Sequence, residues 1–158
     1  MISPKWAVDE VVAFCEEALQ HHEGEQQRGE EKGVPSVYAD SAPFLRDEQS
    51  SFPLVVVRFI SDTPTMMTMK IIAGAYANDR KSGWEEVLNM LRHLRLAMIK
   101  KGVIANRLSL VADSEEPKIT LPEEQPTPNF VGEMIVNFAV AGEAKREINW
   151  EEIYFDNY

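Results

Sequence analysis

Cysteine is almost absent from this sequence, since Cys15 is the single one among 158 residues. One cysteine cannot form an internal disulfide and offers no thiolate pair for zinc, which fits a reducing, intracellular setting. Cys15 follows Phe14 within a helical pattern of apolar residues. We therefore expect a small buried side chain here rather than a nucleophile.

Histidine is also scarce, and the three present lack the spacing of a metal site. His21 and His22 precede Glu23 at the expected end of one helix, while His93 lies inside another. No H-E-x-x-H motif, glycine-rich phosphate loop or nucleophile elbow occurs. The motifs therefore predict no metal and no cofactor.

Paired acids are present but do not form a catalytic pattern. Glu115-Glu116 and Glu123-Glu124 are adjacent residues, whose side chains point in opposite directions on an extended chain. We interpret them as solvated loop charges, so the residues predict no catalytic site and no enzyme. A small hydrolase or metal-dependent enzyme, whose acids converge only in the fold, is the alternative from a different class.

Long apolar runs are missing as well. No run approaches the roughly 20 residues that cross a bilayer. The first twelve residues are amphipathic and acidic, whereas a signal peptide has a basic end followed by an apolar core. We expect no membrane span and no export by that route.

Basic residues are too few to balance the acids, since 16 Lys and Arg face 26 Asp and Glu, for a net charge of −10 at pH 7. Affinity for nucleic acids comes largely from clustered Lys and Arg, so this composition argues against a DNA-binding module. An acidic surface is compatible with DNA passing beside it without being held. An adaptor that binds basic partners through its acidic loop also stays open.

The stretch from Ser82 to Gly102 is the best-defined element and predicts a helix. Ser82 and Glu85 match a capping box, and Gly102 suits the left-handed residue that ends a helix. Apolar residues fall on one stripe at helical spacing: Val87, Leu88, Leu91, Leu94 and Met98.

A second helix is predicted at about Pro4 to His22, where Ser3 and Pro4 are a favourable opening. The polar stretch at about 23–52 shows no hydrophobic period and predicts a long loop. A short strand at 34–39 is only weakly indicated. Two β-rich runs, 53–60 and 65–77, are separated by turn residues and predict a hairpin.

Three further strands are expected in the second half of the chain. Short strands at 107–113 and 118–121 are separated by SEEP, a connection tight enough for a hairpin. The run NFVGEMIVNFAVAGE, from Asn129, is apolar on both faces and should be a central strand. Before it, the prolines of 122–128 favour a stiff segment. The acidic, aromatic tail at 148–158 either packs along the sheet edge or docks onto a neighbouring chain.

The sum is one α+β domain spanning 1–158, with a mostly antiparallel sheet of four to five strands and two main helices packed on it. The length suits one domain with its own core. The sequence shows no internal repeat of fixed period.

Two segments together resemble a known family. The first is IIAGAYANDRKSGWEEVLNMLRHLRLAM, with Asp79 a few residues before Gly83-Trp84, and the second is LPEEQPTPNFVGEM at 121–134. In this order they are similar to the small tail-terminator or tail-completion proteins, found in the neck of long-tailed bacteriophages and prophages. The match covers about 70–140. An aromatic often precedes the Leu-Pro in that family, where this chain has Ile119-Thr120.

The resemblance implies a structural protein of the virion, assembled in the bacterial host cytoplasm and without enzymatic activity. It implies a homo-oligomeric ring, expected to be a hexamer, that ends tail-tube growth. The tail tube protein and the head-tail connector would be its partners, and DNA would pass through the lumen without specific binding. Another minor tail or connector subunit is the alternative within this class.

The loops before the helix and before the last strand carry our candidate contacts between subunits or on the ring face. A ring needs heterologous contacts that close, and these loops offer charged and aromatic side chains for them. Trp84 has a second interpretation, as a side chain that covers the sheet edge. The candidates are Asp79, Arg80, Lys81, Trp84, Glu123 and Glu124.

Overall fold

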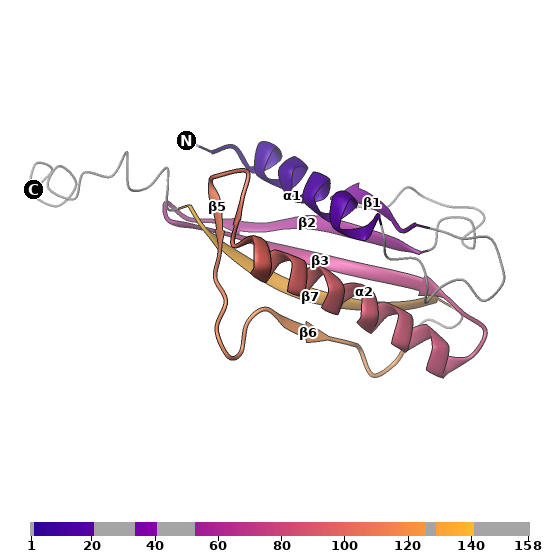
Figure 1. Ribbon diagram of the computed structural model, residues 1–158. Helices are drawn as coiled ribbons and strands as arrows, with labels where there is room; N and C mark the ends of the chain where they lie inside the picture. The colour runs from indigo at the N-terminus through magenta and orange to yellow at the C-terminus, as the bar shows by residue number, and fades with distance from the viewer. Residues whose placement is uncertain (1, 21–33, 41–52, 126–128, 141–158) are drawn as a thin grey trace, which may run out of the picture.

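The computed structural model describes residues 2–20, 34–40, 53–125 and 129–140 (Figure 1). Within these ranges the chain forms two helices and seven strands. In chain order they are α1 (Pro4–Leu19), β1 (Ser36–Ala39), β2 (Leu54–Asp62), β3 (Met66–Tyr76), α2 (Arg80–Lys101), β4 (Val103–Ile104), β5 (Leu108–Leu110), β6 (Lys118–Thr120) and β7 (Asn129–Ala139).

The predictions for His21, His22 and Glu23, for most of the polar stretch and for the acidic tail lie outside the described residues. The α+β class is confirmed. Neither described helix combines the length and the apolar character that crossing a membrane requires.

The sheet is larger than predicted and is mixed. Its order is β1-β2-β3-β7-β5-β4, and β6 also pairs with β7. β1 runs parallel to β2, while the other pairs are antiparallel. The expectation of four to five strands was wrong because β4 is only two residues long, too short to show a period, and β1 had weak signals.

The centre of the sheet matches the prediction. β2 and β3 form the expected antiparallel hairpin, with a register irregularity between Phe59 and Ser61. β7 lies between β3 on one side and β5 and β6 on the other, so it is the central strand expected from its two apolar faces. Its pairing with β3 runs without interruption from Met66↔Ala139 to Tyr76↔Asn129.

β5 and β6 do not form the predicted hairpin. Both run antiparallel to β7 along one edge, β5 opposite Phe138 and Ala139 and β6 opposite 133–135. β5 and β6 pair with the same edge of β7 at different places, and the acidic turn at 113–116 connects them. The Asp113 carboxylate accepts hydrogen bonds from the Glu115 and Glu116 amides at 2.8 and 3.0 Å. The long edge of β7, and not the tight connection, therefore decides the pairing.

Both helices cover the same face of the sheet (Figure 1). α1 packs on β1 and β2, and α2 packs on β3 and β7. The alternation along the strands fits this arrangement, since one side of β3 and β7 is buried against the helices and the other is half-exposed. Large side chains that are fully buried in this layer include Leu19, Met69, Ile71, Leu91, Leu94, Phe130, Met134 and Phe138.

α1 begins where it was predicted to begin. The Ser3 hydroxyl accepts a hydrogen bond from the Trp6 amide at 3.0 Å, and Pro4 occupies the first turn. The helix ends at Leu19, before the predicted His22. His93 of α2 donates from Nε2 to the carbonyl oxygen of Ala18 at 2.8 Å, so this side chain joins the two helices.

α2 begins earlier than the capping-box pattern predicted. Asp79 is the N-cap, and its carboxylate accepts from the Ser82 amide at 2.7 Å and from the Ser82 hydroxyl at 2.9 Å. Ser82 therefore lies inside the first turn, and the prediction of Ser82 as cap was wrong. Gly102 ends the helix with φ of 76°, as expected.

Two glycines allow α2 to lie close to β7. A Cβ at Gly83 would overlap the ring of Phe130, and a Cβ at Gly132 would lie 2.7 Å from Cγ1 of Val87. Both glycines and Phe130 are buried. Gly83 belongs to the first of the two segments that carry the family resemblance, and NFVGEM belongs to the second. These two parts therefore pack against each other, one on α2 and the other on β7.

Candidate functional site

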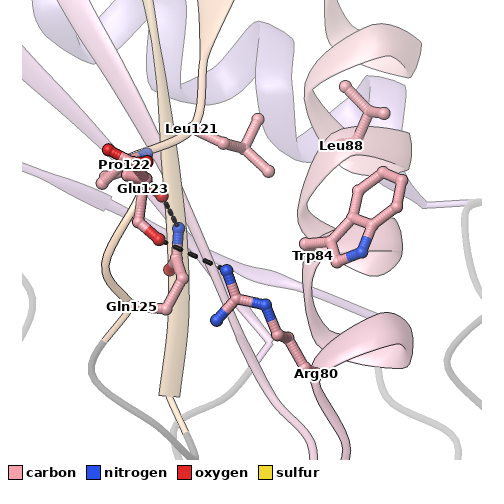
Figure 2. Close-up of a pocket in the computed structure, with 7 residues that line it drawn as sticks. All are labelled: Arg80, Trp84, Leu88, Leu121, Pro122, Glu123 and Gln125. Carbon is pink, nitrogen blue, oxygen red and sulfur yellow. Dashed lines mark hydrogen bonds between the residues drawn. The ribbon is translucent and has the colours of Figure 1, made fainter.

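A groove lies where the start of α2 faces the chain that follows β6 (Figure 2). Its volume is about 400 Å³. Trp84 and Leu88 form one wall from the helix, and Leu121 and Pro122 form the other. The complete lining is Arg80, Trp84, Leu88, Leu121, Pro122, Glu123 and Gln125.

Two arginines, one at the start of α2 and one in its second half, hold the β6 segment against the helix. Nη2 of Arg80 donates to the carbonyl oxygen of Glu123 at 3.3 Å. Nη1 of Arg95 donates to the carbonyl oxygen of Pro117 at 3.1 Å. Hydrogen bonds with a charged donor are stronger than neutral ones, so this pair fixes the second wall of the groove relative to the first.

Gln125 connects one wall of the groove to β7. Its Nε2 donates to the carbonyl oxygen of Pro122 at 2.8 Å, and its Oε1 accepts from the Val131 amide at 2.8 Å. One side chain thereby joins the end of the PEEQ segment to the start of β7. This bridge holds Pro122 close to the start of β7, while residues 126–128 of the segment predicted to be stiff lie outside the described residues.

The lining of the groove combines apolar walls with few charged groups. Its walls are largely apolar, and Trp84 is 38% exposed. Its lining carries one cation, Arg80, and one acid, Glu123, with no serine, cysteine or histidine. Among the residues that the structure describes, no group of three His, Cys, Asp or Glu side chains could hold a metal ion.

Three of the six candidate contact residues line the groove. Arg80 and Trp84 come from α2 and Glu123 from the opposite wall, so segments some 40 positions apart in the sequence share one surface. Asp79 serves as the helix cap instead. Lys81 and Glu124 are exposed and lie outside the lining.

Sequence reasoning missed the rest of the groove. Leu88 was placed on the core stripe, but it is only half-buried and faces the groove. Leu121 was the last residue of a predicted strand, and Arg95 was not among the candidate residues. The prolines marked the segment as stiff, but nothing local identified the helix against which it would lie.

Comparison with known proteins adds no identification. No protein-family model and no curated protein matches this sequence.

Cys15 lies outside the groove and is fully buried, as predicted. Burial raises the pKa of its thiol to about 12, and the charge of Glu16 acts in the same direction. Since the thiolate is the nucleophilic form, Cys15 is inert at neutral pH.

A polar chain crosses the sheet face that is opposite the helices. The hydroxyl of Thr68 on β3 donates to Oδ1 of Asn137 on β7 at 2.6 Å, and Nδ2 of Asn137 donates to Oε1 of Glu116 at 3.1 Å. Glu116 therefore anchors the turn between β5 and β6, which gives one of the paired acids a structural contact.

Proposed function

We propose that this chain is a structural subunit of a long-tailed bacteriophage tail, of the tail-terminator or tail-completion kind. It assembles as a ring, expected to contain six copies, at the end of the tail tube, where it stops tube growth and provides the surface for the head-tail connector. It works in the virion neck, after assembly in the host cytoplasm, and has no enzymatic activity. DNA passes through its acidic lumen without specific binding.

The observation that carries the proposal is the groove between α2 and the chain after β6. The two segments on which the resemblance rests form its two walls, and the hydrogen bond from Arg80 to Glu123 joins them. An open, largely apolar groove with a charged end accepts a protruding segment of a neighbouring subunit, as a closing heterologous contact requires.

Tail-tube assembly tests the proposal directly. The tail-tube protein from the same genome would be polymerised alone and with this chain, and tube lengths would be measured by electron microscopy. We expect shorter tubes of uniform length with a ring at one end. Unchanged lengths, together with a monomeric mass by light scattering in solution and on tubes, would overturn the proposal.

A matched pair of variants tests the groove in the same assay. Trp84→Ala removes a groove wall, whereas Ile60→Ala removes an apolar side chain of similar exposure, 44% against 38%, at the far end of β2. We expect the first variant to lose capping and the second to retain it. The gene order offers a cheaper check, because a neighbouring tail-tube gene supports the proposal and a metabolic operon contradicts it.

A further inference from the structure

Three exposed apolar side chains lie near the end of α2, two of them on its outer face and the third at the start of β4. Leu96 is 53% exposed and Ile99 47%, and Val103, directly after the helix, is 41% exposed. Spacings of three and four place Arg92, Leu96 and Ile99 on one side of the helix, opposite the buried Leu94 and Met98. We call Arg92, Leu96, Ile99 and Val103 the α2 stripe.

The charge of the sequence stretch that carries the α2 stripe is opposite to that of the whole protein. The chain has a net charge of −10, but residues 87–112 contain no Asp or Glu. The same stretch holds five basic residues, which are Arg92, Arg95, Lys100, Lys101 and Arg107. Apolar side chains flanked by cations favour an acidic partner that also has apolar side chains, and not a bare phosphate backbone.

The end of this same chain has that composition. After Arg146 the sequence reads EINWEEIYFDNY, which contains four acids and no Lys or Arg. It also contains Trp150, Ile153 and Phe155, the large apolar types that anchor interfaces. The C-terminal segment and the α2 stripe are therefore complementary in both charge and apolar character.

We infer that the α2 stripe of each subunit binds the C-terminal segment, residues 147–158, of a neighbouring copy. This inference rests on the proposed function, because the ring is the reason to assign the bound tail to a neighbouring subunit and not to the same chain. The tail of one subunit and the stripe of the next make a heterologous contact, in which each subunit is both donor and acceptor. Such contacts form a ring when the rotation between subunits closes. The groove and the stripe are then separate contact surfaces.

Two full-length variants separate the halves of the contact. Leu96→Glu/Ile99→Glu places acids of high helix propensity on the stripe, and Trp150→Ser/Ile153→Ser/Phe155→Ser removes the apolar anchors of the tail. Each alone should break the tail–stripe contact and lower the mass of the assembly, measured by light scattering, below that of the wild type. Ile60→Glu/Met66→Glu, at exposed apolar positions on the β2–β3 hairpin, is the matched control and should assemble as the wild type does.

Mixing the two variants distinguishes binding between subunits from binding within one chain. The stripe variant still has an intact tail, and the tail variant still has an intact stripe, so an equimolar mixture should form heterodimers that cannot grow further. Raising the salt concentration should dissociate them, because the contact joins opposite charges. A mixture whose mass does not exceed that of either variant alone overturns the inference.

Other outcomes also overturn the inference or separate it from the proposed function. Rings that survive both variants would refute the tail contact while leaving the tail-terminator function standing. Heterodimers from a protein that does not cap tail tubes would support the contact and refute the function. A wild-type chain that is monomeric at every concentration would overturn the inference. So would a stripe variant that loses binding to a DNA duplex but keeps the assembly mass of the wild type.

Discussion

Gly83 is the position at which a single methyl group should have the largest effect. Alanine is the better helix former by about 1 kcal/mol, but its Cβ would overlap the fully buried ring of Phe130. Overpacking costs about 1–3 kcal/mol and exceeds this gain when the neighbour cannot move. We expect Gly83→Ala to lower the free energy of unfolding, measured by urea denaturation.

Two controls separate overpacking from backbone effects. Gly102→Ala has open space but a φ of 76°, so it should cost about 1–2 kcal/mol from backbone strain alone. Phe130→Leu combined with Gly83→Ala should recover part of the loss, because the smaller side chain leaves room. A Gly83→Ala protein as stable as the wild type would contradict the packing between α2 and β7.

Cys15 should be protected from thiol reagents for as long as the protein is folded. At about pH 8 an exposed thiol is partly ionised and reacts, whereas this one is buried with its pKa raised to about 12. We expect negligible reaction with Ellman's reagent in native buffer and stoichiometric reaction in concentrated urea. Rapid labelling of the native protein would contradict the burial.

The raised pKa of Cys15 also gives stability a pH dependence. The folded state keeps the thiol protonated, so this contribution is complete below the unfolded pKa of 9.0 and is lost as pH rises towards about 12. Between these values the wild type should lose more stability than Cys15→Ala does. Equal slopes for the two proteins would show that the thiol is ionised in the folded state.

At the scale of elements, the start of α2 depends on Asp79. Its carboxylate accepts hydrogen bonds from the amide and the hydroxyl of Ser82, and losing such a cap costs about 0.5–2 kcal/mol. Asp79→Ala should therefore destabilise the protein by about 1 kcal/mol, and Asp79→Asn by less, as measured by thermal denaturation. If Ser82→Ala proved the more damaging change, Ser82 would be the cap after all.

The elements differ in how far their own residues determine them. Local patterns predicted the two helices and the hairpin: Ser3-Pro4 for α1, the apolar period for α2, and the two β-rich runs for β2 and β3. The pairing of β5 and β6 depends on the length of β7, which lies beyond both in the sequence, and SEEP alone wrongly indicated a hairpin. Asp79 and Ser82 are both good capping residues, so local pattern could not choose between them.

Some residues of the groove could be predicted from local sequence, but the way in which its walls come together could not. Arg80 and Glu123 were identified as charged loop residues, and Trp84 as an aromatic residue near the start of the predicted helix. Their convergence depends on α2 crossing β7 closely, which Gly83 and Gly132 permit through contacts far apart in the sequence. Glycine has no side chain pattern to read, so the feature that brings the walls together carried no local signal.

At the scale of the whole molecule, excess negative charge should lower the stability of the protomer. Net charge far from zero opposes the compact state, and salt reduces this repulsion by shortening the Debye length. Salt would also weaken ion pairs, which among the described residues include Lys5–Asp9 and Lys70–Glu133. The side chains of these two pairs are 28–86% exposed to solvent. Exposed pairs contribute about 0–1 kcal/mol, so repulsion should dominate.

We therefore expect the melting temperature of the dilute protein to rise by about 2–5 °C when sodium chloride is raised to about 0.5 M at neutral pH. The same addition near the sequence pI of about 4.8 should have little effect, because the net charge is then close to zero. This pH comparison controls for general salt effects on hydrophobic burial. A melting temperature that falls with salt at neutral pH would mean that attraction between the basic half of α2 and acidic segments outweighs the repulsion of the remaining charges.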